Sequence, residues 1–159
     1  MALTDYTPPM QQALALAEQA LPADVPVGCV ILDPHGVVIG EGYNRREVDL
    51  NPAGHAEVLA VQAAAKTLGN WRLTGCIAVV TLEPCRMCCE LLVQSRVAGI
   101  VYGASDPLAG GVDSRWKGLD GVSNPPWVLG GVLGTECQHR LHEFFRHKRQ
   151  QPSAKDIQY

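Results

Sequence analysis

The sequence predicts an α/β domain whose sheet is covered by helices on both faces. Strand-like runs alternate with helix-like stretches along the chain, which is the order typical of this class. The runs at 76–82 and 98–104 are almost continuously apolar, as expected of buried strands. With 159 residues, of which 47% are hydrophobic, the chain can bury about 70% of its unfolded surface. We therefore expect one domain over 1–159, with its core at about 10–149 and a flexible tail at 150–159.

Each expected element has a local signal. Apolar positions recur at helical spacing in the first stretch, and Pro22 follows it, where proline ends a helix. The sequence Asp-Pro-His-Gly at 33–36 places turn residues between two strand-like runs, which predicts a hairpin. Pro84 is expected to open a helix because proline is favoured at the first helical position. The expected helices are 10–21, 53–69, 84–95 and about 135–149, and the expected strands are 27–32, 37–44, 76–82, 98–104 and 127–133.

The composition argues against several classes of protein. A net charge of −3 is unlike that of a protein that coats nucleic acid with its whole surface, although a local basic patch can still bind one. The start, MALTDYTPPM, lacks a basic region followed by an apolar one, and no run approaches the roughly 20 apolar residues of a membrane span. We therefore expect a cytoplasmic protein outside the membrane. There, its six cysteines are not expected to form a disulfide framework.

Two short motifs carry candidate chemistry, and each begins an expected helix. His55 and Glu57 form a His-x-Glu motif, and Cys85 and Cys88 form a Cys-x-x-Cys motif. The i, i+3 spacing places both sulfurs on one face of a helix, whose N-terminal dipole favours thiolate. One histidine and two cysteines suit Zn²⁺ and leave a fourth position for water, as in catalytic zinc sites.

The charges of the zinc ion and its two thiolate ligands predict the role of Glu57. Two thiolates already neutralise the ion, so the water at the fourth position needs a base to take its proton. Glu57 can take that proton and later deliver it to a leaving nitrogen. Cys-x-x-Cys alone also occurs in redox sites and structural zinc knuckles, but a redox site would leave His55 and Glu57 unexplained. Cys89 is expected to be a packing residue, because a fourth ligand would close the site.

The combined pattern H-x-E…P-C-x-x-C resembles that of the zinc-dependent cytidine/deoxycytidylate deaminase superfamily. Within it, the chain is most similar to the bacterial tRNA-specific adenosine deaminases. The resemblance covers about 10–149 and rests on these segments: VPVGCVI (25–31), GEGYNRR (40–46), HAEVLAV (55–61), GNWRLTGC (69–76), VTLEPCRMC (80–88), YGASDP (102–107) and EFFRHKRQ (143–150). It implies a three-layer α/β/α sandwich with a central five-stranded mixed sheet, usually in a homodimer with one zinc per chain.

The resemblance also implies roles for particular residues. The reaction implied is hydrolytic deamination of adenosine to inosine at the wobble position, with a tRNA anticodon stem-loop as partner. The implied zinc ligands are His55, Cys85 and Cys88, the proton shuttle is Glu57, and the substrate-binding residues are Asn44, Asp106 and Phe145. The implied RNA contacts are Arg146, Lys148 and Arg149, here called the basic edge. The expected last helix places Leu141, Phe144 and Phe145 against the domain and the basic edge toward phosphates. From the residues alone, the same cations also fit a solvated helix end that complements the macrodipole.

Three departures from the family pattern keep a second function open. The family usually has Ala-Gly-Ala after the second ligand cysteine, where this chain has Cys89-Glu90-Leu91. A lysine is replaced by Leu108, and the second residue of an Asn-His pair is replaced by Pro125. Since the last two changes remove possible RNA contacts, the alternative is a deaminase of the same fold that acts on a free base or nucleoside such as guanine, cytosine or cytidine. A third hypothesis is a non-enzymatic protein that zinc merely stabilises.

Overall fold

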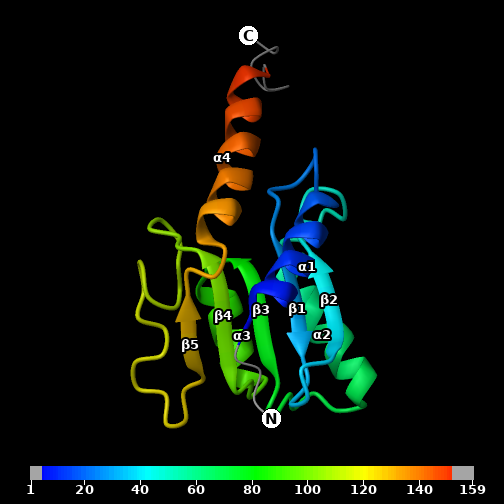
Figure 1. Cartoon of the computed structure of the whole chain (residues 1–159), viewed down its shortest axis with the longest axis vertical. Coiled ribbons are helices and arrows are strands. Elements are labelled where there is room, and N and C mark those ends of the chain that lie inside the picture. The colour runs from blue at the N-terminus through cyan, green and yellow to red at the C-terminus, as the bar shows by residue number, and fades with distance from the viewer. Residues whose placement is uncertain (1–4, 152–159) are drawn as a thin grey trace.

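The computed structural model describes residues 5–151 and contains one mixed five-stranded sheet (Figure 1). The strands lie in the order β2-β1-β3-β4-β5. Strand β1 is antiparallel to β2 and β3, whereas β3, β4 and β5 are parallel. The strands are β1 (Gly28–Leu32), β2 (Val38–Tyr43), β3 (Ile77–Leu82), β4 (Gly99–Ala104) and β5 (Trp127–Gly130), and the helices are α1 (Thr7–Glu18), α2 (Ala56–Leu68), α3 (Arg86–Gln94) and α4 (Gly134–Gln150).

Helices cover both faces of the sheet, so the predicted three-layer α/β/α sandwich is confirmed. Strand β1 shows the arrangement, because successive side chains of a strand point to opposite faces. Val30 packs in one core cluster with Met10 of α1 and Cys137 of α4. Ile31 packs in the other cluster with Ala60 of α2 and with residues of α3. Burial on both faces explains why these strands read as continuous apolar runs.

The two helices that carry the chemistry begin later than predicted. Helix α2 starts at Ala56 rather than at residue 53, because the N–H of Gly54 closes a turn on the Asn51 carbonyl and His55 is extended (φ −77°, ψ 149°). Helix α3 starts at Arg86 rather than at Pro84, because Cys85 is extended (φ −68°, ψ 175°). His55 and Cys85 are therefore N-cap residues, whose backbone leaves the helix while their side chains stay beside its first turn.

The boundaries of three other elements also differ from the prediction. Helix α1 begins at Thr7, with prolines in its first turn, and ends at Glu18 before Pro22 is reached. Strand β5 stops at Gly130 because Gly131 (φ 88°) and Leu133 (φ 49°) turn the chain into α4. Helix α4 continues through residue 150, the first residue of the predicted tail, and residues 152–159 of that tail lie outside the described part of the chain. Among the described helices, none has the length and apolar character needed to cross a membrane.

Close packing of α2 against β2 sets the position of the site. A Cβ at Gly42 would lie 2.4 Å from the carbonyl oxygen of Ala56, the first residue of α2. A Cβ at Gly40 would lie 2.3 Å from the carbonyl oxygen of Ala60, one turn further along. Backbone therefore approaches backbone where only glycine leaves room. On the other face, α4 projects beyond the end of the sheet (Figure 1).

Candidate active site

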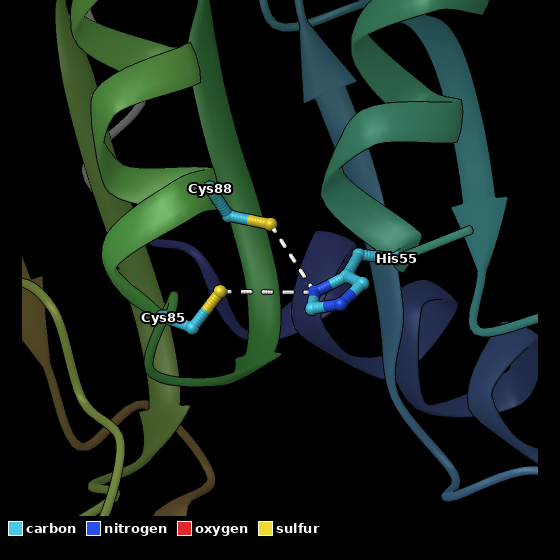
Figure 2. Close-up of side chains that lie close together, drawn as sticks. All are labelled: His55, Cys85 and Cys88. Atoms are coloured by element: carbon cyan, nitrogen blue, oxygen red, sulfur yellow. Dashed lines mark hydrogen bonds between the residues drawn. The ribbon is translucent and has the colours of Figure 1, made fainter. Parts of the chain in front are cut away.

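Three predicted ligands meet between the N-terminal ends of α2 and α3 (Figure 2). The Nδ1 atom of His55 lies 3.7 Å from the Sγ atom of Cys85 and 3.5 Å from that of Cys88. The three ligand atoms all lie within 4.8 Å of one another. One imidazole nitrogen and two thiol sulfurs form a donor set that suits Zn²⁺. The residues present therefore fit one zinc ion.

The electrostatics of this cluster favour a thiolate. Hydrogen bonds from Cys88 and from His55 lower the pKa of Cys85 to about 4. In return, the hydrogen bond to Cys85 raises the pKa of His55. The N-terminus of α3 adds its dipole at the same place. Since thiolate rather than thiol binds a metal, Cys85 is prepared for ligation near neutral pH.

Glu57 lies in the first turn of α2 and is almost fully buried, with 4% of its surface exposed. Burial raises the pKa of its carboxyl group. A carboxylate with a raised pKa can take up a proton and return it under conditions where an exposed glutamate would stay ionised. Glu57 lines the same cavity as His55 and Cys85.

A cavity of about 210 Å³ is lined by two of the three ligands, His55 and Cys85. Of the predicted substrate-binding residues, Asn44 and Asp106 line it. The Asn44 amide donates to the Val25 carbonyl at 3.1 Å and accepts from the Arg46 N–H at 3.2 Å, which fixes its orientation. The residues that line this cavity are Val25, Val27, Asn44, Arg46, His55, Ala56, Glu57, Leu82, Glu83, Cys85, Asp106 and Ala109.

Asp106 has a structural task as well as a place in the cavity. Its Oδ1 atom accepts hydrogen bonds from the backbone N–H groups of Leu108 and Ala109, both at 3.1 Å. These bonds form the turn that brings Ala109 to the cavity. Asp106 therefore shapes the wall of the cavity through its Oδ1 atom.

Phe145 does not line this cavity but an adjoining one of about 310 Å³. The two cavities share Val25, Asn44 and Arg46. Phe145 is 45% exposed, so the prediction that it anchors α4 is wrong. Phe144, which the same prediction placed against the domain, is buried as expected, because neighbouring residues of a helix point about 100° apart.

Only one of the three residues of the basic edge lines the adjoining cavity. Lys148 lines the adjoining cavity, with its Nζ atom 5.6 Å from the centre of the Phe144 ring. Arg146 and Arg149 are exposed and line neither cavity. A larger cavity, of about 640 Å³, lies between α1 and α4 and contains none of the predicted catalytic residues. We therefore place the chemistry in the smaller cavity at the ligands.

Two charged residues of the ligand cavity were missed by reasoning from the sequence. Arg46 lines both the ligand cavity and the adjoining one. The sequence feature that could have identified Arg46 is its position two residues after Asn44 in the GEGYNRR segment. Glu83 lines the ligand cavity although it is almost fully buried. The sequence feature that could have identified Glu83 is its position directly before Pro84 and Cys85.

The departures from the family pattern lie away from the ligand cavity. Leu108 is 87% exposed, and Pro125 is also exposed. Cys89 is buried with its sulfur beside Gly118 and is not part of the three-ligand cluster, which confirms its predicted packing role. None of these residues lines the ligand cavity.

Comparison with known proteins confirms the resemblance. The profile of the cytidine and deoxycytidylate deaminase zinc-binding region matches residues 4–104. The chain belongs to this deaminase family. It is therefore a zinc-dependent deaminase with the cytidine-deaminase-like fold, and the metal that the three ligands fit is the metal of its family.

The similar proteins include tRNA adenosine deaminases and a guanine deaminase. A tRNA-specific adenosine deaminase of Haemophilus influenzae is 39% identical over 89% of this chain and 84% of that protein. A tRNA:A34 deaminase structure, described as editing at the wobble position of transfer RNA, has 34% identity, covers 83% of this chain and 97% of that one, and has a TM-score of 0.78. A guanine deaminase of Bacillus subtilis has 33% identity, covers 64% of this chain and 66% of that one, and has a TM-score of 0.60.

Proposed function

We propose that this deaminase converts adenosine to inosine at the wobble position of a tRNA anticodon. The observation that carries the proposal is that the ligand cavity adjoins a second cavity with an exposed phenylalanine and a lysine. A deaminase of a free base needs only the first cavity, whereas an extruded nucleotide keeps its neighbours and their phosphates. Identity to tRNA-specific adenosine deaminases over most of the chain supports the same substrate.

The chain's own residues have distinct roles in this reaction. His55, Cys85 and Cys88 would hold the zinc ion, which supplies the acidification of the attacking water. Glu57 takes a proton from the water that attacks the adenine ring and delivers it to the amino nitrogen, which leaves as ammonia. The Asn44 amide has one N–H group in a bond to Val25, and its second N–H can donate to the nucleoside.

The second cavity is suited to the nucleotides beside the flipped base. Phe145 is exposed enough for a base to stack on it, a contact that tolerates any sequence. Arg46 and Lys148 bring cations to the same cavity, where phosphates of the loop would pass. The exposed Arg146 and Arg149 extend this charge along α4.

We also propose a homodimer that works in the cytoplasm, where a tRNA substrate is found. The family resemblance supports the dimer, and light scattering of the purified protein tests it directly. A mass of one chain at working concentration would contradict this part of the proposal.

The deciding experiment measures ammonia and inosine from a wobble-adenosine stem-loop, in parallel with free adenosine, cytidine, cytosine and guanine. Inosine formed in the stem-loop, with the free compounds inert, supports the proposal. Turnover of a free base with an inert stem-loop would refute it in favour of the alternative. Glu57→Gln serves as the control, because it should keep zinc and folding but lose turnover; a protein that zinc merely stabilises would show no turnover in either form.

A further inference from the structure

Glu83 forms an unusual number of hydrogen bonds for one buried side chain. It follows the end of β3 and is 2% exposed. Its Oε1 atom accepts from the backbone N–H groups of Val112 (3.3 Å), Asp113 (2.7 Å) and Ser114 (2.9 Å). Its Oε2 atom accepts from the N–H of Asp106 (3.0 Å) and from the Ser114 hydroxyl. The carboxylate thus occupies an anion site that three successive N–H groups form.

The segment held by Glu83, residues 106–114, is a wall of the ligand cavity. Asp106 and Ala109 of this segment line the cavity. The backbone of Gly110 forms a bridge with that of Cys85, and the N–H of Gly111 donates to the Pro84 carbonyl at 2.7 Å. The wall is therefore attached both to the Glu83 carboxylate and to the turn that carries a ligand cysteine.

The charge of Glu83 makes this attachment strong. A buried carboxylate is costly unless its lone pairs are all used. Here the five donors come from residues 106–114, so the carboxylate loses its hydrogen bonds if the segment moves away. Hydrogen bonds to a charged group are about twice as strong as neutral ones. The arrangement holds the wall in one conformation before any substrate arrives.

We propose that Glu83 is a positioning residue for deamination, which keeps segment 106–114 in the conformation that receives the substrate. The inference rests on the proposed function only for the choice of substrate in the assay. Glu83 has no part in the proton transfer, which belongs to Glu57. Because Glu83 already orders this segment, substrate binding does not have to supply the free energy of ordering it.

The test is Glu83→Gln in the zinc-loaded enzyme. The amide has the shape of the carboxylate but keeps a single acceptor oxygen, so its NH2 group faces N–H donors that then lack a partner. We expect KM to rise by about tenfold or more while kcat stays within about threefold, since one charged hydrogen bond is of this order. Hydrogen exchange of the amides at 112–114 should accelerate by at least about tenfold. Zinc content should remain about one per chain, as in the unchanged enzyme.

Asp33→Asn is the matched control. The Asp33 carboxylate also accepts from backbone N–H groups of a turn, those of His35 (2.8 Å) and Val37 (2.9 Å), but it lies in the β1–β2 hairpin away from the cavity. This variant should leave KM and the exchange of 112–114 unchanged. A second variant, Ser114→Ala, removes one of the five donors and should raise KM by about two- to fivefold with faster local exchange. It also serves as the test if Glu83→Gln does not fold.

Three results would overturn the proposal. The first is a lower melting temperature with KM and local exchange unchanged, which would make Glu83 a structural residue only. The second is loss of zinc, which would assign Glu83 to the metal site instead of the wall. The third is an unchanged Ser114→Ala variant. If the unchanged enzyme deaminates a free base and not the stem-loop, the proposed function fails, and the same KM comparison is made with that free base.

Discussion

Gly42→Ala should damage the active site through helix α2. The new Cβ atom would lie 2.4 Å from the Ala56 carbonyl oxygen, whereas an ordinary contact is at least 3.4 Å. The first turn of α2 must therefore move by about 1 Å, the difference between these two distances. His55 and Glu57 flank Ala56, so both move with it, whereas Cys85 and Cys88 stay on α3. Misplacement of reacting groups by about 1 Å can cost about a hundredfold in rate.

Gly40→Ala is the matched control for this prediction. Its Cβ atom would lie 2.3 Å from the Ala60 carbonyl oxygen, a clash of the same size but one turn further from the ligands. Both variants should lower the free energy of unfolding by about 1–3 kcal/mol, as overpacking does. The rate, however, should fall by about a hundredfold for Gly42→Ala and by less than about tenfold for Gly40→Ala.

The assay compares kcat for wobble-adenosine deamination well below the melting temperature of each variant, with zinc content measured on the same samples. Urea unfolding measures the two losses of stability. Equal rates in the two variants at equal losses of stability would refute the reasoning. That outcome would mean that the first turn of α2 can move by this distance without disturbing the ligands.

Four further predictions concern the ligands, the proton carrier, the basic edge and a surface ion pair. Purified protein should contain about one zinc per chain, and the Cys85→Ala/Cys88→Ala double variant should lose it; full retention of zinc would exclude both ligands. Glu57→Gln should reduce kcat by about 10²- to 10⁴-fold with zinc unchanged, and a smaller loss would remove Glu57 from the proton transfer. Neutralising the basic edge should weaken tRNA binding and reduce its salt slope by about two to three, whereas an unchanged slope would return these cations to a solvated helix end. The hydrogen bond from the Arg45 guanidinium lowers the pKa of Asp49 from 3.8. The ion pair between them therefore persists above pH 3.8 and is lost as the pH falls through the lowered pKa. In Arg45→Gln, an NMR titration should show the pKa of Asp49 rise toward 3.8.

Local signals were sufficient to predict the order of the elements and the candidate residues of the metal site. The spacing of Cys85 and Cys88 is a property of one helix start, and His55 and Glu57 lie within two residues of each other. The interpretation of both pairs as parts of one zinc site came from residue chemistry together with the family resemblance. Helix starts were less accurate, because an extended N-cap residue such as His55 and a first helical residue look alike in sequence.

Contacts between distant segments could not be predicted in the same way. Glu83 binds Asp106 and residues 112–114, which are more than twenty positions away. The hydrophobic periodicity of the sequence gives no information on contacts over such distances. Arg46 lies in the turn after β2 and lines two cavities, one of which is also lined by residues of α4. That Phe144 is buried while Phe145 is exposed depends on how α4 packs against the rest of the domain, which the sequence pattern did not reveal.

By itself, the sequence predicted an α/β deaminase in which one histidine and two cysteines bind zinc and a glutamate carries the proton. These features depend on residue type and on spacings of a few positions, which the chain carries whatever its packing. Only the tertiary structure decided that His55 lies within 3.7 Å of both sulfurs, that the cavity continues toward α4, and that a buried carboxylate holds one wall of the cavity. Those depend on how close segments come across the sheet, and side-chain volume and backbone hydrogen bonds set that distance once the whole chain has folded.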